Sequence, residues 1–226
     1  MRYSIKELFY TLQGEGAHSG RPAVFCRFTG CNLWSGREAD RADAICRFCD
    51  TDFVGSDGTG GGKFATPEAL ATAIAACWPG TPAPTPLCKR GVAKPGGFRY
   101  VVCTGGEPLL QLDEPLIAAL HDCGFAVAVE SNGTQPAPPG LDWICVSPKA
   151  HAPLRLTQGD ELKLVYPQSE PEAQPECFVD LAFRYFFLQP LDGPDREIHT
   201  QAAVAYCLAH PQWRLSLQTH KLLGIP

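Results

Sequence analysis

Short apolar runs that alternate with helical patterns place the strongest constraint on how this chain folds. The runs are brief and nearly continuous, as in strands buried on both faces; they are residues 23–28, 99–104, 126–130, 143–147, 161–165, 185–188 and 213–217. Apolar residues recur at helical spacing over residues 69–78, 113–123 and 197–208. Thr66, Pro67 and Glu68 have the residue types of a helix N-cap and first turn. This order predicts an α/β fold built on a parallel sheet or partial barrel.

Polar or glycine-rich segments follow several of these strand-like runs. They are Thr29-Gly30-Cys31, Thr104-Gly105-Gly106-Glu107-Pro108, Ser131-Asn132-Gly133-Thr134, Ser147-Pro148-Lys149 and Gln189-Pro190-Leu191-Asp192. In parallel α/β folds, ligands bind at the carboxyl ends of the strands. One such segment would be an ordinary turn, but several of them together predict a shared site along one edge of the sheet.

The length of the chain favours a single domain. Its 226 residues, 45% of them hydrophobic, are enough to bury a core without staples. We expect one domain over residues 1–226, with flexible insertions near residues 55–62 and 79–97, which are rich in Gly and Pro. The formal net charge of −5 disfavours nucleic acid as a partner. No apolar run is long enough to span a membrane, so no membrane partner is expected.

The cysteine content points to metal or redox chemistry. The chain has 11 Cys, an odd number that excludes complete pairing in intramolecular disulfides. Residues 1–7 run into mixed polar sequence without the apolar stretch of a signal peptide. We therefore expect a cytoplasmic protein, in which clustered cysteines hold a metal or act in redox chemistry.

Three cysteines stand apart from the other eight, for which burial in the core is the simpler interpretation. Cys31 follows the first strand-like run, and Cys46 and Cys49 have two residues between them, a spacing typical of metal ligands. Three thiolates on one loop fit a [4Fe–4S] cluster with one open iron. A zinc site, which needs four ligands, and the absence of any metal remain alternatives. A thioredoxin-like pair would leave Cys31 unexplained.

These motifs together resemble a radical S-adenosylmethionine enzyme. Asp50-Thr51 follows Cys49, and Gly105-Gly106-Glu107-Pro108 follows the strand-like run 99–104. The usual gap between the first two cysteines is three residues, whereas here it is fourteen. The segments Tyr10-Thr11-Leu12-Gln13-Gly14-Glu15-Gly16, Gly20-Arg21-Pro22, Gln218-Thr219-His220-Lys221 and Gly224-Ile225-Pro226 resemble the 7-carboxy-7-deazaguanine synthase family, some members of which have an expanded first gap.

The resemblance implies a modified partial (β/α)6-type barrel and a specific reaction. The family converts 6-carboxy-5,6,7,8-tetrahydropterin to 7-carboxy-7-deazaguanine and ammonia in the biosynthesis of queuosine and other 7-deazapurines. It uses a [4Fe–4S] cluster, S-adenosyl-L-methionine and Mg2+. Its members are typically homodimers, and a flavodoxin-type electron donor is expected.

The resemblance also assigns roles to residues. Cys31, Cys46 and Cys49 would hold the cluster, and Thr51 would bind Mg2+. The expected S-adenosylmethionine contacts are Phe48, Cys49, Asp50, Gly106, Ser147, Pro148, Lys149, Gln189, Pro190, Leu191 and Asp192. The expected substrate contacts are Leu12, Gln13, Gly14, Glu15, Arg27, Thr104 and Pro226. No protein side chain is assigned as catalytic, because the cofactor supplies the radical chemistry.

Several of these assignments have a simpler structural alternative. Arg27 can pair with a substrate carboxylate or form a salt bridge at the rim. Asp50 is an alternative Mg2+ ligand to Thr51, or the two form a turn. Lys149 and Asp192 can be solvated charges, and His220 can belong to the pocket or to the core. For the whole chain, an activase for a glycyl-radical protein and a zinc-binding module without enzymatic activity are the competing hypotheses.

Overall fold

A nine-stranded sheet forms the centre of the protein, which we describe from a computed structural model covering residues 3–80 and 99–226. The strand order is β3-β1-β2-β4-β5-β6-β7-β8-β9. The strands are β1 (Tyr3–Leu12), β2 (Pro22–Phe28), β3 (Gly62–Phe64), β4 (Arg99–Gly105), β5 (Phe125–Ser131), β6 (Trp143–Val146), β7 (Gln158–Tyr166), β8 (Ala182–Pro190) and β9 (Trp213–Leu215). All neighbouring pairs from β2 to β9 are parallel. The carboxyl ends of these strands therefore share one edge, as the sequence predicted.

Two strands at one end of the sheet, β1 and the edge strand β3, were not predicted from the apolar runs. β1 pairs antiparallel with β2 and with β3. The alternation of buried and exposed residues in β1 is interrupted where the register shifts between Ile5 and Glu7. Such a bulge inserts an extra residue and breaks the twofold pattern by which a strand is recognised.

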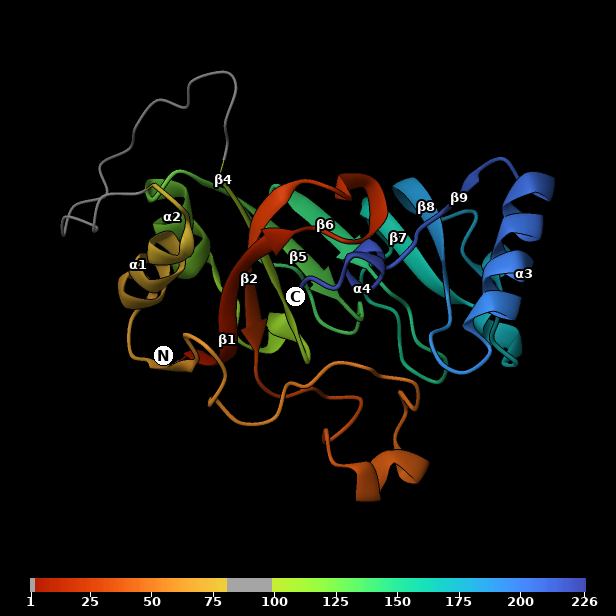
Figure 1. Ribbon diagram of the computed structural model, residues 1–226, viewed down its shortest axis with the longest axis horizontal. Helices are drawn as coiled ribbons and strands as arrows, with labels where there is room; N and C mark the ends of the chain where they lie inside the picture. Colours follow the sequence, from red (N-terminus) through yellow and green to blue (C-terminus); the bar gives the residue numbers. More distant parts are fainter. Residues whose placement is uncertain (1–2, 81–98) are drawn as a thin grey trace.

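Three of the four helices, α1 to α3, cover one face of the sheet. The helices in the described residues are α1 (Pro67–Cys77), α2 (Glu114–Asp122), α3 (Arg196–Ala209) and the short α4 (Thr219–Leu223), with 3-10 turns η1 (Gly16–His18), η2 (Glu38–Asp43), η3 (Pro108–Leu110), η4 (Pro171–Ala173) and η5 (Pro175–Cys177). α1 and α2 pack over the β1, β2, β4 and β5 part of the sheet, and α3 packs over β7, β8 and β9 (Figure 1). The chain reverses at the C-terminus, so α4 and the last residues lie in front of the middle of the sheet (Figure 1).

The predicted helix starts are confirmed by their caps. The Thr66 hydroxyl accepts a hydrogen bond from the Ala69 amide at 3.2 Å, and the Asp113 carboxylate accepts one from the Leu116 amide at 3.1 Å. Both helices carry Pro in the first turn, where the missing amide hydrogen costs nothing. The connections 132–142 and 147–157 contain no helix, so the helical layer is thinner than in a regular barrel of repeated β/α units.

The first predicted insertion is fastened to the edge of the sheet. The Gly58 amide donates to the Lys6 carbonyl at 3.0 Å, and the Leu8 amide donates to the Thr59 carbonyl at 2.7 Å. The Lys6 ammonium adds ion pairs to Asp52 and Asp57. The second predicted insertion lies outside the described residues from position 81 onward. Among the residues that the structure describes, no helix has the length and apolar character needed to cross a lipid bilayer.

Candidate functional site

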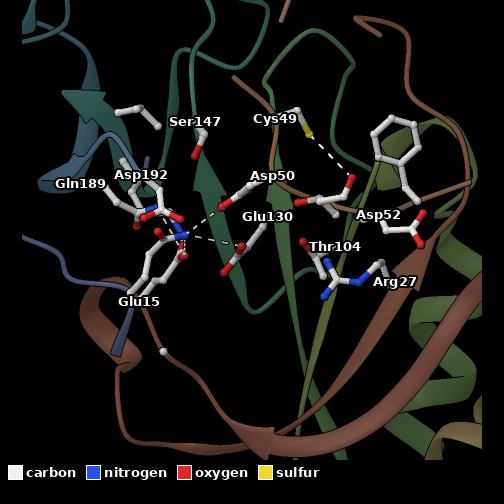
Figure 2. Close-up of a pocket in the computed structure, with 18 of the residues that line it drawn as sticks. Glu15, Arg27, Cys49, Asp50, Asp52, Thr104, Glu130, Ser147, Gln189 and Asp192 are labelled. Carbon is white, nitrogen blue, oxygen red and sulfur yellow. Dashed lines mark hydrogen bonds and ion pairs between the residues drawn. The ribbon is translucent and has the colours of Figure 1, made fainter. Parts of the chain in front are cut away.

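A cavity of about 460 Å³ opens on the face of the sheet that the large helices leave uncovered. All of the site residues predicted from the sequence, except Pro148, line this cavity; so does His220. Its walls come from the ends of parallel strands, from the cysteine loop and from the two ends of the chain (Figure 2). The segments that the sequence predicted to share one edge of the sheet therefore meet.

The three singled-out cysteines share this cavity. Cys31, which follows β2, accepts a hydrogen bond from the Leu33 amide at a Sγ–N distance of 3.4 Å. A hydrogen bond from the Cys46 thiol lowers the pKa of Cys49 to about 6, against the effect of burial, and raises the pKa of Cys46. Within the described ranges, no three His, Cys, Asp or Glu side chains enclose a single metal ion. A four-iron cluster takes each thiolate on a different iron, so more widely spaced cysteines suit it.

The residues between Cys31 and Cys46 form a small folded lobe. The Leu33 carbonyl accepts from the amides of Ile45 and Cys46, so the lobe starts and ends at one point. Within it, the Arg41 guanidinium lies 4.1 Å from the centre of the Trp34 ring.

Arg41 also holds the turn that carries the other two cysteines. Its guanidinium donates to the carbonyls of Arg47 and Cys49, at 2.9 and 3.1 Å. The expanded gap is thus a packed structure that positions the Cys46–Cys49 turn.

The glycine pair after β4 brings two strand ends together. The Gly106 amide donates to the Phe28 carbonyl at 3.1 Å, and the Glu107 amide donates to the Gly30 carbonyl at 2.9 Å. A Cβ atom on Gly106 would lie 1.9 Å from the Gly30 oxygen. The absence of a side chain on Gly106 therefore lets the two strand ends approach and sets the position of the chain entering Cys31.

Glu107 fixes the neighbouring strand end. Its carboxylate is completely buried and accepts from the Leu109 amide, the Ser131 hydroxyl and the Asn132 amide at 2.8 to 3.0 Å. Burial raises the pKa of Glu107. The Asn132 side chain continues this network by donating to Asn32, next to Cys31.

We expect Gly106→Ala to destabilise the fold by about 2–4 kcal/mol, because the new methyl group clashes with backbone that cannot move without shifting β2. Urea unfolding of the protein without cofactors measures this effect. Gly20→Ala is the matched control. Gly20 has φ +86° but nothing within 4 Å of a Cβ atom, so only backbone strain of about 1–2 kcal/mol is expected. Equal stability of Gly106→Ala and the unmodified protein would contradict the steric argument.

A buried lysine, absent from the sequence prediction, organises the opposite wall of the cavity. Lys163 in β7 pairs with Glu15 and lies 3.7 Å from Glu130 in β5. Its side chain is only 5% exposed. Gln13 donates to Glu130 at 2.9 Å, and Gln218 donates to Glu15 at 3.1 Å.

The charges of this network support one another. Burial alone would raise the pKa of Glu15, but the nearby Lys163 ammonium lowers it. Burial alone would lower the pKa of Lys163, but Glu130 and Glu15 raise it well above its usual value. The wall therefore presents fixed carboxylates and amides, which match a flat ligand with several N–H groups.

Arg27 is only partly free to receive a ligand. Its Nε donates to Glu7 at 2.7 Å, across the β1–β2 pair. The guanidinium still lines the cavity and lies beside Thr104 in Figure 2. The salt bridge at the rim is therefore confirmed. The pairing of Arg27 with a substrate carboxylate stays a prediction, which this salt bridge does not prevent, because a guanidinium has donors for two partners.

The C-terminal residues are joined to the N-terminal ones at the cavity. The Thr11 hydroxyl donates to the Pro226 carbonyl at 2.9 Å, and the Thr219 amide donates to the Gly14 carbonyl at 2.9 Å. A Cβ atom on Gly14 would lie 2.2 Å from His220 Nδ1, so His220 packs directly against this turn. His220 thus belongs to the cavity wall.

Comparison with known proteins decides the family. A scan against protein-family models finds no match. The chain is 65% identical to the 7-carboxy-7-deazaguanine synthase of Bordetella pertussis and 58% identical to that of Burkholderia multivorans, in each case over 226 residues and 100% of both chains. The chain belongs to the 7-carboxy-7-deazaguanine synthase family. The crystal structure of QueE from Escherichia coli superposes with a TM-score of 0.68 at 29% identity, covering 96% of this chain and 94% of that one. The predictions of family and of a modified partial-barrel fold are confirmed.

Some of the residues that the likeness to 7-carboxy-7-deazaguanine synthase assigns to the cofactor are in contact with the turn that carries Cys46 and Cys49 or are joined to it through Lys221. Lys149 donates to the Ser147 carbonyl at 2.7 Å and lies 5.9 Å from the Phe48 ring centre. Asp50 and Asp192 both pair with Lys221 at 2.6 Å. Burial would raise the pKa of Asp50, but the Lys221 ammonium lowers it. Lys221 belongs to a segment whose sequence resembles the family, but its position between two carboxylates was not predicted.

Proposed function

We propose that this chain converts 6-carboxy-5,6,7,8-tetrahydropterin to 7-carboxy-7-deazaguanine, with release of ammonia, as a carbon–nitrogen lyase of queuosine and 7-deazapurine biosynthesis. The observation that carries the proposal is the full-length identity of up to 65% to curated relatives of that name. The meeting of Cys31, Cys46 and Cys49 with a hydrogen-bonding wall in one cavity gives further support. The whole chain acts as one domain in this proposal.

The three cysteines fit an iron–sulfur cluster. Thiolates are the usual ligands of such clusters, and the lowered pKa of Cys49 favours its ionised form near neutral pH. Three ligands leave one iron open to S-adenosyl-L-methionine. When bound, the cluster and S-adenosylmethionine supply the radical chemistry, and the protein holds the reactants in place and excludes water.

S-adenosylmethionine would lie between the cysteine turn and the ends of β6 and β8. Phe48 provides an aromatic face, and Gly106 leaves the backbone open to close approach. The remaining contacts in this proposal come from Asp50, Ser147, Pro148, Lys149, Gln189, Pro190, Leu191 and Asp192. Pro148 does not line the cavity, so its part is to direct the chain between Ser147 and Lys149.

The pterin would bind against the wall organised by Lys163. Glu15 and Gln13, with the backbone of Leu12 and Gly14, match the donor and acceptor pattern of the ring. Arg27 and Thr104 face the substrate carboxylate, and Pro226 closes the pocket. Thr51 offers Mg2+ one neutral oxygen, which is a weak site alone, so the metal assembles there with substrate oxygens and water.

The expected localisation, oligomeric state and electron donor are based on membership of the family. We propose a cytoplasmic homodimer that receives electrons from a flavodoxin-type protein. The small-molecule substrate agrees with the size of the cavity, about 460 Å³, which lies in the range of ligand pockets.

The direct test is anaerobic reconstitution with iron and sulfide, followed by turnover of the carboxypterin with S-adenosylmethionine, a reductant and Mg2+. We expect 5′-deoxyadenosine in assays with the substrate, a deazaguanine carboxylate product by mass spectrometry, and a slower reaction without Mg2+. A protein that gains the cluster but leaves the carboxypterin unchanged would contradict the proposal and favour a glycyl-radical activase. One zinc per chain and no iron chemistry would favour a zinc-binding module.

A further inference from the structure

The last nine residues, 218–226, form a segment that crosses from one side of the cavity to the other. Gln218, His220, Lys221 and Pro226 all line the cavity. Gln218 contacts Glu15, and the Pro226 carbonyl contacts Thr11, both on the proposed substrate side. Lys221 pairs with both Asp50 and Asp192, on the proposed cofactor side, where Gln218 also donates to Asp50 at 3.4 Å.

The segment has little apolar anchorage. Its helix, α4, contains no buried residue, and Leu222 and Leu223 are 61% and 63% exposed. The position of residues 218–226 therefore depends on polar contacts. Within the described part of the chain, both ion pairs of the segment are made by Lys221.

The two carboxylates that Lys221 bridges come from distant parts of the sequence. Asp50 directly follows Cys49, and Asp192 follows β8. Both oxygens lie 2.6 Å from the Lys221 Nζ, whose side chain is 28% exposed. One cation between two carboxylates offsets their mutual repulsion, and a partly shielded site weakens this attraction less than open solvent would.

We propose that Lys221 is a positioning residue that couples the cofactor side of the cavity to the substrate side. The inference rests on the proposed function and adds a route by which one ligand affects the other. A cofactor that orders Asp50 and Asp192 also orders Lys221, and with it the segment that carries Gln218 and Pro226 to the substrate. Thermodynamic linkage then requires that each ligand strengthen the binding of the other.

The test compares Lys221→Met with the conservative Lys221→Arg and with Lys63→Met, an exposed lysine of β3 that does not line the cavity. Hydrogen exchange of peptides covering residues 218–226 is measured first, on the full chain without cofactors. We expect exchange in Lys221→Met to be about fivefold faster, the size expected for two partly exposed ion pairs, with no change in Lys63→Met. Thermal melting verifies that all three variants fold.

Turnover by the reconstituted enzyme gives the second readout. We expect Lys221→Met to raise the KM for the carboxypterin about fivefold, with a smaller effect on kcat, and to reduce by a similar factor the gain in pterin affinity caused by S-adenosylmethionine. Lys221→Arg should keep the KM for the carboxypterin and the coupling between the two ligands close to those of the unmodified enzyme.

The outcomes separate the two proposals. Unchanged exchange in Lys221→Met, or an unchanged KM together with undiminished coupling, would overturn the role of Lys221 while leaving the reaction intact. If Lys221→Met exchanges faster as expected but the unmodified chain does not convert the pterin, the proposed function is refuted, and with it the coupling.

Discussion

Replacing Cys49 by serine abolishes formation of 5′-deoxyadenosine, with an expected loss of at least about a thousandfold. The Cys49 thiol has its pKa lowered to about 6 because it accepts a hydrogen bond from Cys46. A serine hydroxyl stays protonated at neutral pH and is a poor ligand for iron in clusters. Iron content, visible absorbance and 5′-deoxyadenosine yield after anaerobic reconstitution measure the effect.

Cys177→Ser is the matched control for this experiment. Cys177 is exposed, lies in η5 and donates to the Pro171 carbonyl, away from the cavity. We expect this variant to keep the iron content and activity of the unmodified chain. If Cys49→Ser retained both as well, the assignment of the cluster to the cysteine loop would be wrong.

Replacing Lys163 by methionine is expected to lower kcat/KM for the carboxypterin by about 10²–10³-fold and the free energy of unfolding by about 3–5 kcal/mol. The variant leaves Glu15 buried without its cation and removes the charge beside Glu130. Methionine nearly preserves the length of the side chain, so lost packing contributes little. Steady-state kinetics and urea unfolding at neutral pH measure the two effects.

The pH dependence of stability separates lost charge from lost shape. In the unmodified chain the pKa of Glu15 is lowered, so its contribution to stability is present above the usual Glu pKa and is lost as the pH falls through the folded value. In Lys163→Met, burial raises the pKa of Glu15, so acidification relieves the unpaired charge. The difference in unfolding free energy should therefore shrink between about pH 7 and pH 5. A constant difference would mean that packing, and not charge, explains the loss. In the double variant Lys163→Met, Glu15→Gln, stability should partly return and activity should not.

The edge of the sheet that carries the site was predictable because it depends on local patterns. Apolar runs followed by polar segments such as Ser147-Pro148-Lys149 place the site at strand ends in any parallel α/β fold. The spacing of Cys46 and Cys49 likewise needs only one turn of chain. The individual substrate and cofactor residues came from family likeness and not from spacing.

Lys163 was missed although the sequence contains a signal for it. In Glu161-Leu162-Lys163-Leu164-Val165, alternation puts Glu161, Lys163 and Val165 on one face of a strand flanked by buried neighbours. Charged residues on a face of an internal strand indicate a polar interior, and the apolar content of the run concealed this. Its partners, Glu15 and Glu130, could not be found from local sequence, because they are brought together only by the curvature and register of the sheet.

The contacts of Arg27 and Lys221 were unpredictable for a related reason. Arg27 meets Glu7 because β1 runs antiparallel to β2, and β1 itself was hidden by its bulge. Lys221 meets Asp50 across 171 positions of sequence. Ion pairs of this kind depend on the completed fold. In the sequence, each of the charged residues is indistinguishable from an ordinary solvated residue.

The lobe between Cys31 and Cys46 has a closed neck, so the number of residues in this gap has little effect on how the three cysteines are placed. Because the Leu33 carbonyl accepts from the amides of both Ile45 and Cys46, the two ends of the lobe adjoin whatever number of residues lies between them. Inside the lobe, Arg41 holds the Cys46–Cys49 turn and Trp34 packs against Phe53. Insertions or deletions distal to that neck can accumulate at small entropic cost. Searches that require a fixed spacing between the first two cysteines will therefore overlook chains of this architecture, whereas a search for the Cys-x-x-Cys turn with its neighbouring strand ends would recover them.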